Sequence, residues 1–140
     1  MEGSSLTDSI GVAVIGAGMA GRSHAQAYRN AHTVFGSDAP TVRLVAIADI
    51  NADFANHTKN RYGFERTEES WQAIVDADDI DAVSIVVANH LHREIAEALL
   101  AAGKHVLCEK PLASSVEDAE AMAKGAAESG RVADCGFSYR

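Results

Sequence analysis

The 140-residue sequence has few aromatic residues and few prolines. Phe, Trp and Tyr make up 6% of the chain and only two residues are proline, whereas 47% of the chain is hydrophobic. Much of this apolar content is Ala, Val, Ile and Leu, a composition that favours closely packed layers of helix and strand over a disordered or fibrous chain. The length suits one domain with a full core and is too short for two ordinary domains. We therefore expect one folded unit.

The sequence also lacks long apolar runs. No run approaches the roughly 20 residues that a membrane-spanning helix needs. The first ten residues, MEGSSLTDSI, have neither the basic start nor the apolar segment of a signal peptide. We expect a cytoplasmic protein with no membrane partner, in which residues 1–9 form a flexible amino terminus and the folded domain occupies residues 10–140.

Positive charge is in the minority. The chain has 12 Lys and Arg residues against 20 Asp and Glu residues, which gives a formal net charge of −8. A solvated acidic surface repels nucleic acid and anionic lipid, so we expect no nucleic-acid partner.

Only two cysteines are present, Cys108 and Cys135. Their separation fits neither a metal-ligand cluster nor a short-range disulfide, so we expect reduced thiols that pack as small hydrophobic residues of strands. The two side chains would come close only if their strands are neighbours. His90 and His92 have the spacing of a metal-binding pair, but no further ligand cluster accompanies them, and we expect no metal site.

Apolar runs typical of strands alternate with segments of helical composition. The expected strands lie at residues 10–16, 42–49, 64–68, 81–88, 104–109 and 131–139, and the expected helices at 19–31, 51–63, 69–76, 92–103 and 115–130. Gly63, Gly103 and Gly130 stand where three helices would end, and residues 31–41 are expected to form an irregular connection. Runs that are apolar on both faces and alternate with helices predict a parallel sheet, covered on both sides and joined by right-handed crossovers.

A glycine motif lies between the first expected strand and the first expected helix. In Gly16-Ala17-Gly18-Met19-Ala20-Gly21 the three glycines have GxGxxG spacing. Such a motif uses Gly16 for a tight turn, Gly18 to admit a pyrophosphate and Gly21 for close helix packing, while the amides of Met19 and Ala20 face the phosphates. The alternative is a strand-to-helix turn that binds no ligand. With the alternating elements, the motif predicts an α/β fold: a Rossmann-type doubly wound parallel sheet of about six strands in three α/β/α layers.

Asp49 ends the second expected strand, where an acidic residue accepts hydrogen bonds from the ribose of a bound dinucleotide. It lies 28 residues beyond Gly21, where about 20 is typical, and the connection at 31–41 accounts for the excess. A carboxylate there repels the 2′-phosphate of NADP, and no Arg or Lys occurs in residues 50–58 to bind that phosphate. We therefore expect NAD rather than NADP. Alternatively, Asp49 only caps the helix that begins near Asn51.

Three segments resemble the amino-terminal domain of the glucose-fructose oxidoreductase/inositol dehydrogenase (Gfo/Idh/MocA) family. They are GAGMAGRSH, VANHLHREIAEALLAAGKHVLCEKPLA and GFSYR. The resemblance covers about residues 10–140, and the EKP triplet after AGKHVLC is its most specific part. It implies an NAD(P)-binding Rossmann domain, and it implies that a second α/β domain, which binds the substrate, is absent from this chain.

The resemblance also implies roles for the residues after the fourth and fifth strands. Lys110 would be the catalytic lysine that positions and polarises the substrate hydroxyl or carbonyl, Glu109 would hold the loop or contact the nicotinamide ribose, and Pro111 would rigidify the turn. An ammonium suits this role because it donates hydrogen bonds to oxygen.

The loop after the fourth strand departs from the family pattern. The family has Thr-Pro-Asn followed by a His, whereas this chain has Val87-Ala88 ahead of Asn89 and His92. Ala88, Asn89 and His92 are implied cofactor contacts, and Asn89 has the alternative role of a helix N-cap. His24 matches a histidine of the family that we expect to pack, or to support the site from behind the residues that contact the ligand, rather than to take part in chemistry.

The implied function is that of the cofactor-binding domain of an NAD(P)-dependent oxidoreductase. It would transfer a hydride between nicotinamide and a hydroxyl carbon of a sugar, polyol or cyclitol, a small-molecule substrate. We expect this chain alone to be inactive, and homo-oligomers to form only with the missing domain. Two alternatives are an NAD-using glycoside hydrolase of the same architecture and a regulatory protein that binds NAD without chemistry, although Lys110 argues against the second.

Overall fold

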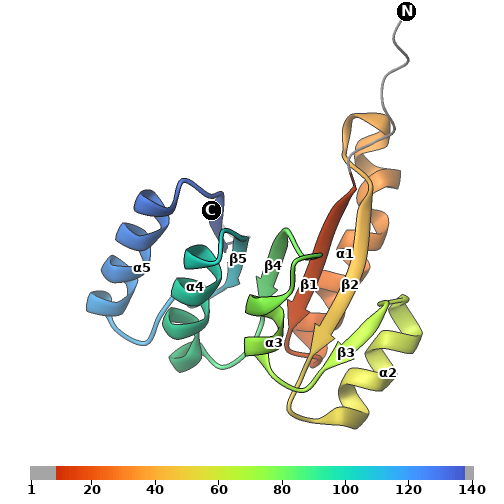
Figure 1. The fold of residues 1–140 in the computed structure, drawn as a ribbon, viewed down its shortest axis with the longest axis horizontal. Coiled ribbons are helices and arrows are strands. Elements are labelled where there is room, and N and C mark those ends of the chain that lie inside the picture. The colour runs from red at the N-terminus through yellow and green to blue at the C-terminus, as the bar shows by residue number, and fades with distance from the viewer. Residues whose placement is uncertain (1–8, 138–140) are drawn as a thin grey trace, which may run out of the picture.

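The computed structural model describes residues 9–137, which form one six-stranded parallel sheet with helices on both faces (Figure 1). The strand order is β3-β2-β1-β4-β5-β6, which is the predicted doubly wound topology. The strands are β1 (Ile10–Ile15), β2 (Val42–Ala48), β3 (Arg66–Glu68), β4 (Ala82–Ile85), β5 (His105–Glu109) and β6 (Ala133–Gly136). The helices are α1 (Met19–Phe35), α2 (Ala52–Tyr62), α3 (Trp71–Asp76), α4 (His92–Ala101) and α5 (Val116–Ser129), with short 3-10 turns η1 (Gly36–Asp38) and η2 (Asn89–Leu91).

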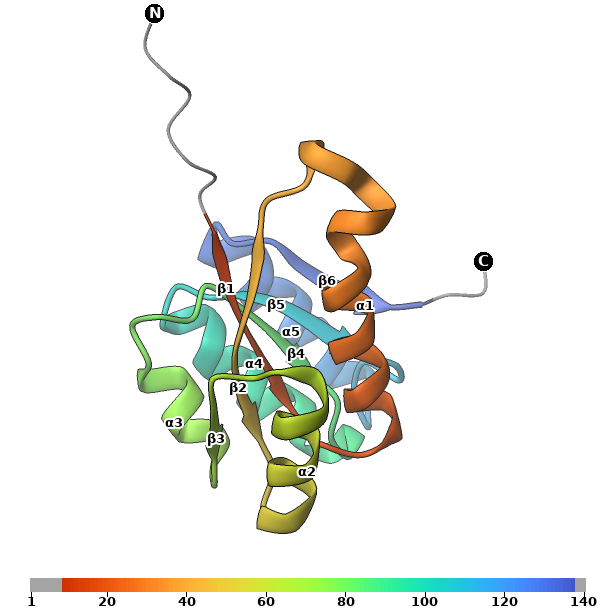
Figure 2. The same ribbon diagram turned by 90° about the vertical axis from the view of Figure 1, so that its right-hand side faces the viewer.

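Two hydrophobic clusters lie on the two faces of the sheet. The larger cluster joins Ile15 of β1 to Ile74 of α3, Leu99 of α4 and Met122 of α5. The smaller one joins Val14 of β1 and neighbouring strand residues to Ala25 of α1. Adjacent residues of β1 thus face opposite layers, which is why this strand is apolar throughout. Figure 2 shows α1 on the opposite side of the sheet from α3 and α4.

Local sequence signals set the ends of the helices. The Asn51 side chain accepts a hydrogen bond from the amide of Phe54 at the start of α2, and α2 ends at Gly63, which has a φ of 80°. Ser115 caps α5 in the same way, and α5 ends at Gly130, with a φ of 68°. A side-chain cap of this kind is worth about 1 kcal/mol. The helix ends expected at these glycines are confirmed.

The connection expected at residues 31–41 is mostly helical. α1 continues to Phe35 and is followed by η1, so the sequence-based expectation of an irregular segment is wrong. Val34 and Phe35 are both more than two-thirds exposed. This last turn projects beyond the sheet and depends on backbone hydrogen bonds, which apolar periodicity does not reveal. Residues 1–8 of the expected flexible terminus (1–9) and residues 138–139 of the last expected strand (131–139) lie outside the described part of the chain.

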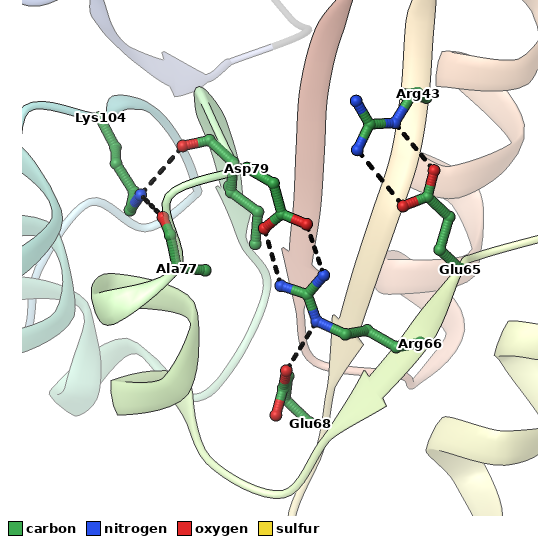
Figure 3. Close-up of polar contacts among 8 residues, drawn as sticks. Arg43, Glu65, Arg66, Glu68, Ala77, Asp79 and Lys104 are labelled. Atoms are coloured by element: carbon green, nitrogen blue, oxygen red, sulfur yellow. Dashed lines mark hydrogen bonds and ion pairs between the residues drawn. The ribbon is translucent and has the colours of Figure 1, made fainter.

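Hydrogen bonds and an ion pair from two basic side chains hold the connection between α3 and β4 (Figure 3). Lys104, only 5% exposed, donates hydrogen bonds from Nζ to the carbonyl oxygens of Ala77 at 2.6 Å and Ile80 at 2.9 Å. Arg66 binds both carboxylate oxygens of Asp79, at 2.7 and 2.9 Å, and this pair raises the pKa of Arg66 and lowers that of Asp79. These contacts fix the amino ends of β4 and β5. No helix within residues 9–137 is both long enough and apolar enough to cross a bilayer.

Candidate functional site

The predicted site residues follow the carboxyl ends of four neighbouring strands. β2, β1, β4 and β5 are parallel, so these ends lie at one edge of the sheet (Figure 1). The glycine motif follows β1, Asp49 follows β2, the Ala88–Asn89 segment follows β4, and Glu109 ends β5 just before Lys110. Dinucleotides bind a doubly wound sheet at this edge, where the strand order reverses between β1 and β4. Segments far apart in the sequence therefore share one edge.

The turn between β1 and α1 requires glycine at two positions. Gly16 has a φ of 112°, and a Cβ atom on it would collide with the carbonyl oxygen of Val86. A Cβ atom on Gly21 would collide with the carbonyl oxygen of Gly16, so α1 packs directly against the end of β1. Gly16 and Gly21 therefore have the turn-forming and close-packing roles that the motif predicts.

The amino end of α1 is open to solvent. Gly18 occupies the N-cap position, no side chain caps the helix, and the first turn has no acidic residue. Gly18, Met19 and Ala20 are exposed, and a Cβ atom on Gly18 would have no heavy atom within 4 Å. The first amides of a helix lack partners within the helix and carry the positive end of its dipole. This end of α1 can therefore bind an anionic group such as a pyrophosphate.

Asp49 ties the end of β2 to the glycine turn. Its Oδ2 accepts a hydrogen bond from the amide of Ala17 at 2.8 Å, and its Oδ1 accepts one from the amide of Asn51 at 2.7 Å. Asn51, not Asp49, is the N-cap of α2, so the alternative of a helix-capping aspartate is wrong. Each carboxylate oxygen has a further acceptor site. Asp49 can thus support the turn and accept a hydroxyl group at the same time.

An apolar surface and an open pocket lie next to Asp49. Ile50 is 98% exposed and Phe54 is 56% exposed. Residues of the glycine turn and of α2 line an open pocket of about 500 Å³. Its lining residues are Ala17, Gly18, Arg22, Asp53, Phe54, His57 and Thr58. Sequence reasoning missed this surface, because an isoleucine at a strand end carries no local signal that it will face solvent.

Glu109 joins the end of β5 to the segment that follows. Its Oε2 accepts a hydrogen bond from the amide of Lys110 at 2.9 Å. Lys110 and Pro111 are exposed, and the peptide between them is cis. The pKa of Glu109 is lowered, chiefly by its hydrogen bond with His24 and further by the Lys110 amide and charge, against the opposing effect of burial.

His24 of α1 contacts Glu109 at the carboxyl end of β5. Its Nε2 lies 2.9 Å from Glu109 Oε1 and its Nδ1 lies 3.0 Å from the hydroxyl of Ser84, which is fully buried in β4. Tyr28 completes the group, with its hydroxyl 2.7 Å from that of Ser84. Burial raises the pKa of Tyr28, and the hydrogen bond to Ser84 lowers it in part. The sequence predicts packing or indirect support of the site for His24 but does not reveal this partner, because His24 lies 85 positions from Glu109.

His92 is buried beneath the loops that follow β4 and β5. It is 1% exposed, with Nε2 at 2.9 Å from the carbonyl oxygen of Val87 and Nδ1 at 3.0 Å from that of Pro111. It therefore joins the loop after β4 to the loop after β5, and its ring is buried between these loops and α4. The N-cap of α4 is Leu91, so Asn89 does not cap that helix, and it opens η2 instead.

The two cysteines lie opposite each other on β5 and β6. Both thiols are free, and burial, with smaller effects from Cys135 and Glu109, raises the pKa of Cys108 to about 12. Such a thiol is a poor nucleophile at neutral pH. Within residues 9–137, no group of three or more His, Cys, Asp or Glu side chains is arranged to hold a metal ion.

Comparison with known proteins identifies the family of this chain. Residues 10–137 match the Gfo/Idh/MocA model described as an oxidoreductase family with an NAD-binding Rossmann fold. The chain is 41% identical over 134 residues to a levoglucosan dehydrogenase of Pseudarthrobacter phenanthrenivorans, an alignment that covers 94% of this chain and 34% of the relative. It is 33% identical over 129 residues to inositol 2-dehydrogenase of Salmonella typhimurium, which covers 91% of this chain and 36% of that enzyme.

A solved structure supports the same family assignment. Levoglucosan dehydrogenase in complex with NADH has a TM-score of 0.91 and 37% identity to this chain, over 95% of this chain and 36% of that structure. This chain thus spans about a third of the length of its relatives. The chain belongs to the Gfo/Idh/MocA oxidoreductase family, and its described residues form the NAD-binding Rossmann domain of that family.

Proposed function

We propose that this domain serves a dehydrogenase that transfers a hydride between NAD and a hydroxyl carbon of a sugar, polyol or cyclitol. The observation that carries the proposal is the position of Lys110. It is exposed at the end of β5, on the same sheet edge as the open amino end of α1. The levoglucosan and inositol dehydrogenases among the relatives support a sugar or cyclitol as the substrate class.

Several residues of the edge fit the parts of NAD. The amides of Met19 and Ala20, with Gly18, would bind the pyrophosphate, and Asp49 would accept a ribose hydroxyl. The exposed side chain of Ile50 offers an apolar surface to the adenine ring. Together these contacts would fix the adenosine half beside the end of β2.

The loops after β4 and β5 fit the other half of the cofactor. Ala88 and Asn89 would lie beside the nicotinamide, and His92 would support them by holding their loop against the one that contains Lys110. When bound, NAD supplies the hydride acceptor. Lys110 would bind the substrate oxygen and help to move its proton, while Glu109 would keep the Lys110 backbone in place through their 2.9 Å hydrogen bond.

We propose that the substrate is bound mainly outside this chain. The relatives are about three times as long as the part that this chain matches, and the family resemblance implies a second α/β domain with an Asp and a His that complete the catalytic group. Full activity would therefore need that second domain.

Kinetics of the full-length protein test the proposal. With levoglucosan or inositol as substrate, we expect net NADH formation, and we expect Lys110→Ala to lower kcat/KM by at least about 100-fold, the typical contribution of a positioned proton-transfer group. Lys124→Ala is a matched control because Lys124 is 76% exposed on α5. Hydrolysis of a glycoside without net NADH would favour the hydrolase alternative, and NAD binding without turnover would favour a regulatory protein.

A further inference from the structure

A chain of hydrogen bonds connects α1 to the end of β5. It runs from the Tyr28 hydroxyl to the Ser84 hydroxyl, from there to His24 Nδ1, and from His24 Nε2 to Glu109 Oε1. Glu109 Oε2 then accepts the amide of Lys110. Four elements or loops thus meet through polar side chains, although Ser84 has no exposed surface and the His24 side chain is only 14% exposed.

The carboxylate of Glu109 determines which partner is the donor in each of these hydrogen bonds. An ionised carboxylate accepts only, so His24 Nε2 carries the hydrogen that it donates to Glu109. When the ring carries this one hydrogen, Nδ1 accepts the Ser84 hydroxyl hydrogen, and Ser84 in turn accepts from Tyr28. This arrangement gives every hydrogen an acceptor. With a hydrogen on Nδ1 as well, either the Ser84 or the Tyr28 hydroxyl hydrogen would have no acceptor within the group.

The Glu109 carboxylate is confined from two sides. His24 holds Oε1 from the side of α1, and a Cβ atom on Gly136 of β6 would lie only 3.2 Å from the carboxyl carbon. The groups that face the carboxylate include the imidazole of His24, the amide and charge of Lys110, the thiols of Cys108 and Cys135, and the backbone of β6. The carboxylate packs against the backbone at Gly136 on one side, and on the other side the contact of Oε1 with His24 sets the direction in which Oε2 points.

We propose that His24 is a positioning residue for the Lys110 loop. It orients the Glu109 carboxylate so that Oε2 accepts the Lys110 amide, and in this way it fixes the backbone from which the Lys110 side chain reaches the cofactor site. The inference deepens the proposed function and rests on it, because the position of Lys110 matters for catalysis only if Lys110 has the proposed role. An apolar residue of similar size could fill the same space, but it would leave the buried Ser84 hydroxyl and one carboxylate oxygen without these partners.

Two substitutions separate positioning from packing. In His24→Gln, the side-chain amide can occupy the place of Nε2 and still donate to Glu109. In His24→Asn, the shorter amide reaches only the place of Nδ1, so it keeps the contact with Ser84 and loses the one with Glu109. His32→Asn is the control for a histidine-to-amide change on the same helix, because His32 lies exposed in the last turn of α1.

The amide of Lys110 reports the result in the chain without cofactor, by NMR. We expect hydrogen exchange of this amide to be about tenfold faster in His24→Asn, the effect of losing one hydrogen bond, and unchanged in His24→Gln and His32→Asn. The chemical shift of the Lys110 amide also reports the titration of Glu109, which accepts its hydrogen bond. Since the contact with His24 lowers the pKa of Glu109, we expect the midpoint of this titration to move to higher pH in His24→Asn. Equal changes in the Gln and Asn variants would show that His24 acts by packing alone, and an unchanged amide in His24→Asn would overturn the proposal.

Two further measurements complete the test. If His24→Asn does not fold, Ser84→Ala removes the hydroxyl partner of Nδ1. We expect Ser84→Ala to speed hydrogen exchange of the Lys110 amide by a smaller factor; exchange at the wild-type rate would count against the proposal.

Titration with NADH tests the proposed function separately from the position of the Lys110 amide. We expect His24→Asn to weaken binding by roughly threefold to tenfold, the range for one hydrogen bond. Failure of the wild-type chain to bind NADH would contradict the proposed function while leaving the NMR result valid.

Discussion

At the scale of the residue, Asp49 combines a structural contact with a proposed binding role. Its two oxygens hold the amides of Ala17 and Asn51, so the carboxylate is fixed before any ligand arrives. A fixed negative charge at this position favours NAD, which has two ribose hydroxyls there, over NADP, which has a phosphate.

We predict that Asp49→Ser narrows the preference of the chain for NAD over NADP. The substitution removes both the hydrogen bonds to the ribose and the repulsion of the 2′-phosphate, so the difference between the two binding free energies should shrink by on the order of 1–3 kcal/mol. Calorimetric titration with each cofactor measures it. Asp38→Ser, in η1 after the far end of α1, is the control. An unchanged ratio would mean that Asp49 does not face the ribose.

Lys104 is a buried cation that serves the fold. Its ammonium is bound by two carbonyl oxygens of the α3–β4 connection, those of Ala77 and Ile80 (Figure 3). We predict that Lys104→Met lowers the free energy of unfolding by about 2–4 kcal/mol, because it leaves both carbonyl groups without this donor. Urea unfolding measures the loss. Lys124→Met on the exposed face of α5 should change stability by less than about 0.5 kcal/mol, and an equal loss in both variants would contradict this account.

At the scale of the element, the contact between α1 and β1 has no room for a side chain at Gly21. A Cβ atom there would meet the carbonyl oxygen of Gly16, which is backbone and cannot rotate away. We predict that Gly21→Ala lowers the free energy of unfolding by about 1–3 kcal/mol, as overpacking does. It should also weaken NAD binding, because α1 shifts away from the end of β1.

Gly125 provides the matched control in thermal unfolding. It lies within α5, and a Cβ atom on it would have no heavy atom within 4 Å. Gly125→Ala should therefore raise stability by about 0.5–1 kcal/mol through its better helix propensity. A loss of stability at Gly125, or none at Gly21, would show that helix propensity rather than close packing governs these positions.

Most of the elements could be predicted from the sequence because their signals are local. Apolar runs gave the strands of the sheet, and Gly63 and Gly130 marked two helix ends. What could not be predicted depends on distant residues. The contact of His24 with Glu109 spans 85 positions, and the burial of His92 depends on carbonyl groups of a loop 19 and 20 residues away. The GxGxxG spacing predicted the turn, but nothing in it shows that Asp49 binds the Ala17 amide.

At the scale of the whole molecule, the described residues provide one wall of the proposed active site. Hydride transfer needs the substrate carbon held within about 3–3.5 Å of its acceptor in a site that excludes water. Lys110 is exposed here, and the chain covers about a third of the length of the related dehydrogenases.

We predict that the 140-residue chain binds NAD with micromolar or weaker affinity and forms no NADH with inositol or levoglucosan. Orientation of the reactants supplies several kcal/mol of catalysis, and one wall cannot provide it. Fluorescence titration and absorbance of NADH measure the two quantities, with the full-length protein as the positive control. Steady NADH formation by the chain alone would show that the β5 loop carries a complete active site.

The central position of β1 also determines when the chain can fold during synthesis. Among the strands of the described residues β1 is made first, yet one of its neighbours, β4, begins 67 residues after β1 ends, at Ala82 after Ile15. At ribosomal rates of roughly 5–20 residues per second, one side of β1 stays unpaired for about 3–13 s. A nascent chain that ends near residue 80 should therefore remain sensitive to protease, whereas one that has released residue 137 should resist it. Protection already complete at residue 80 would contradict this order of events.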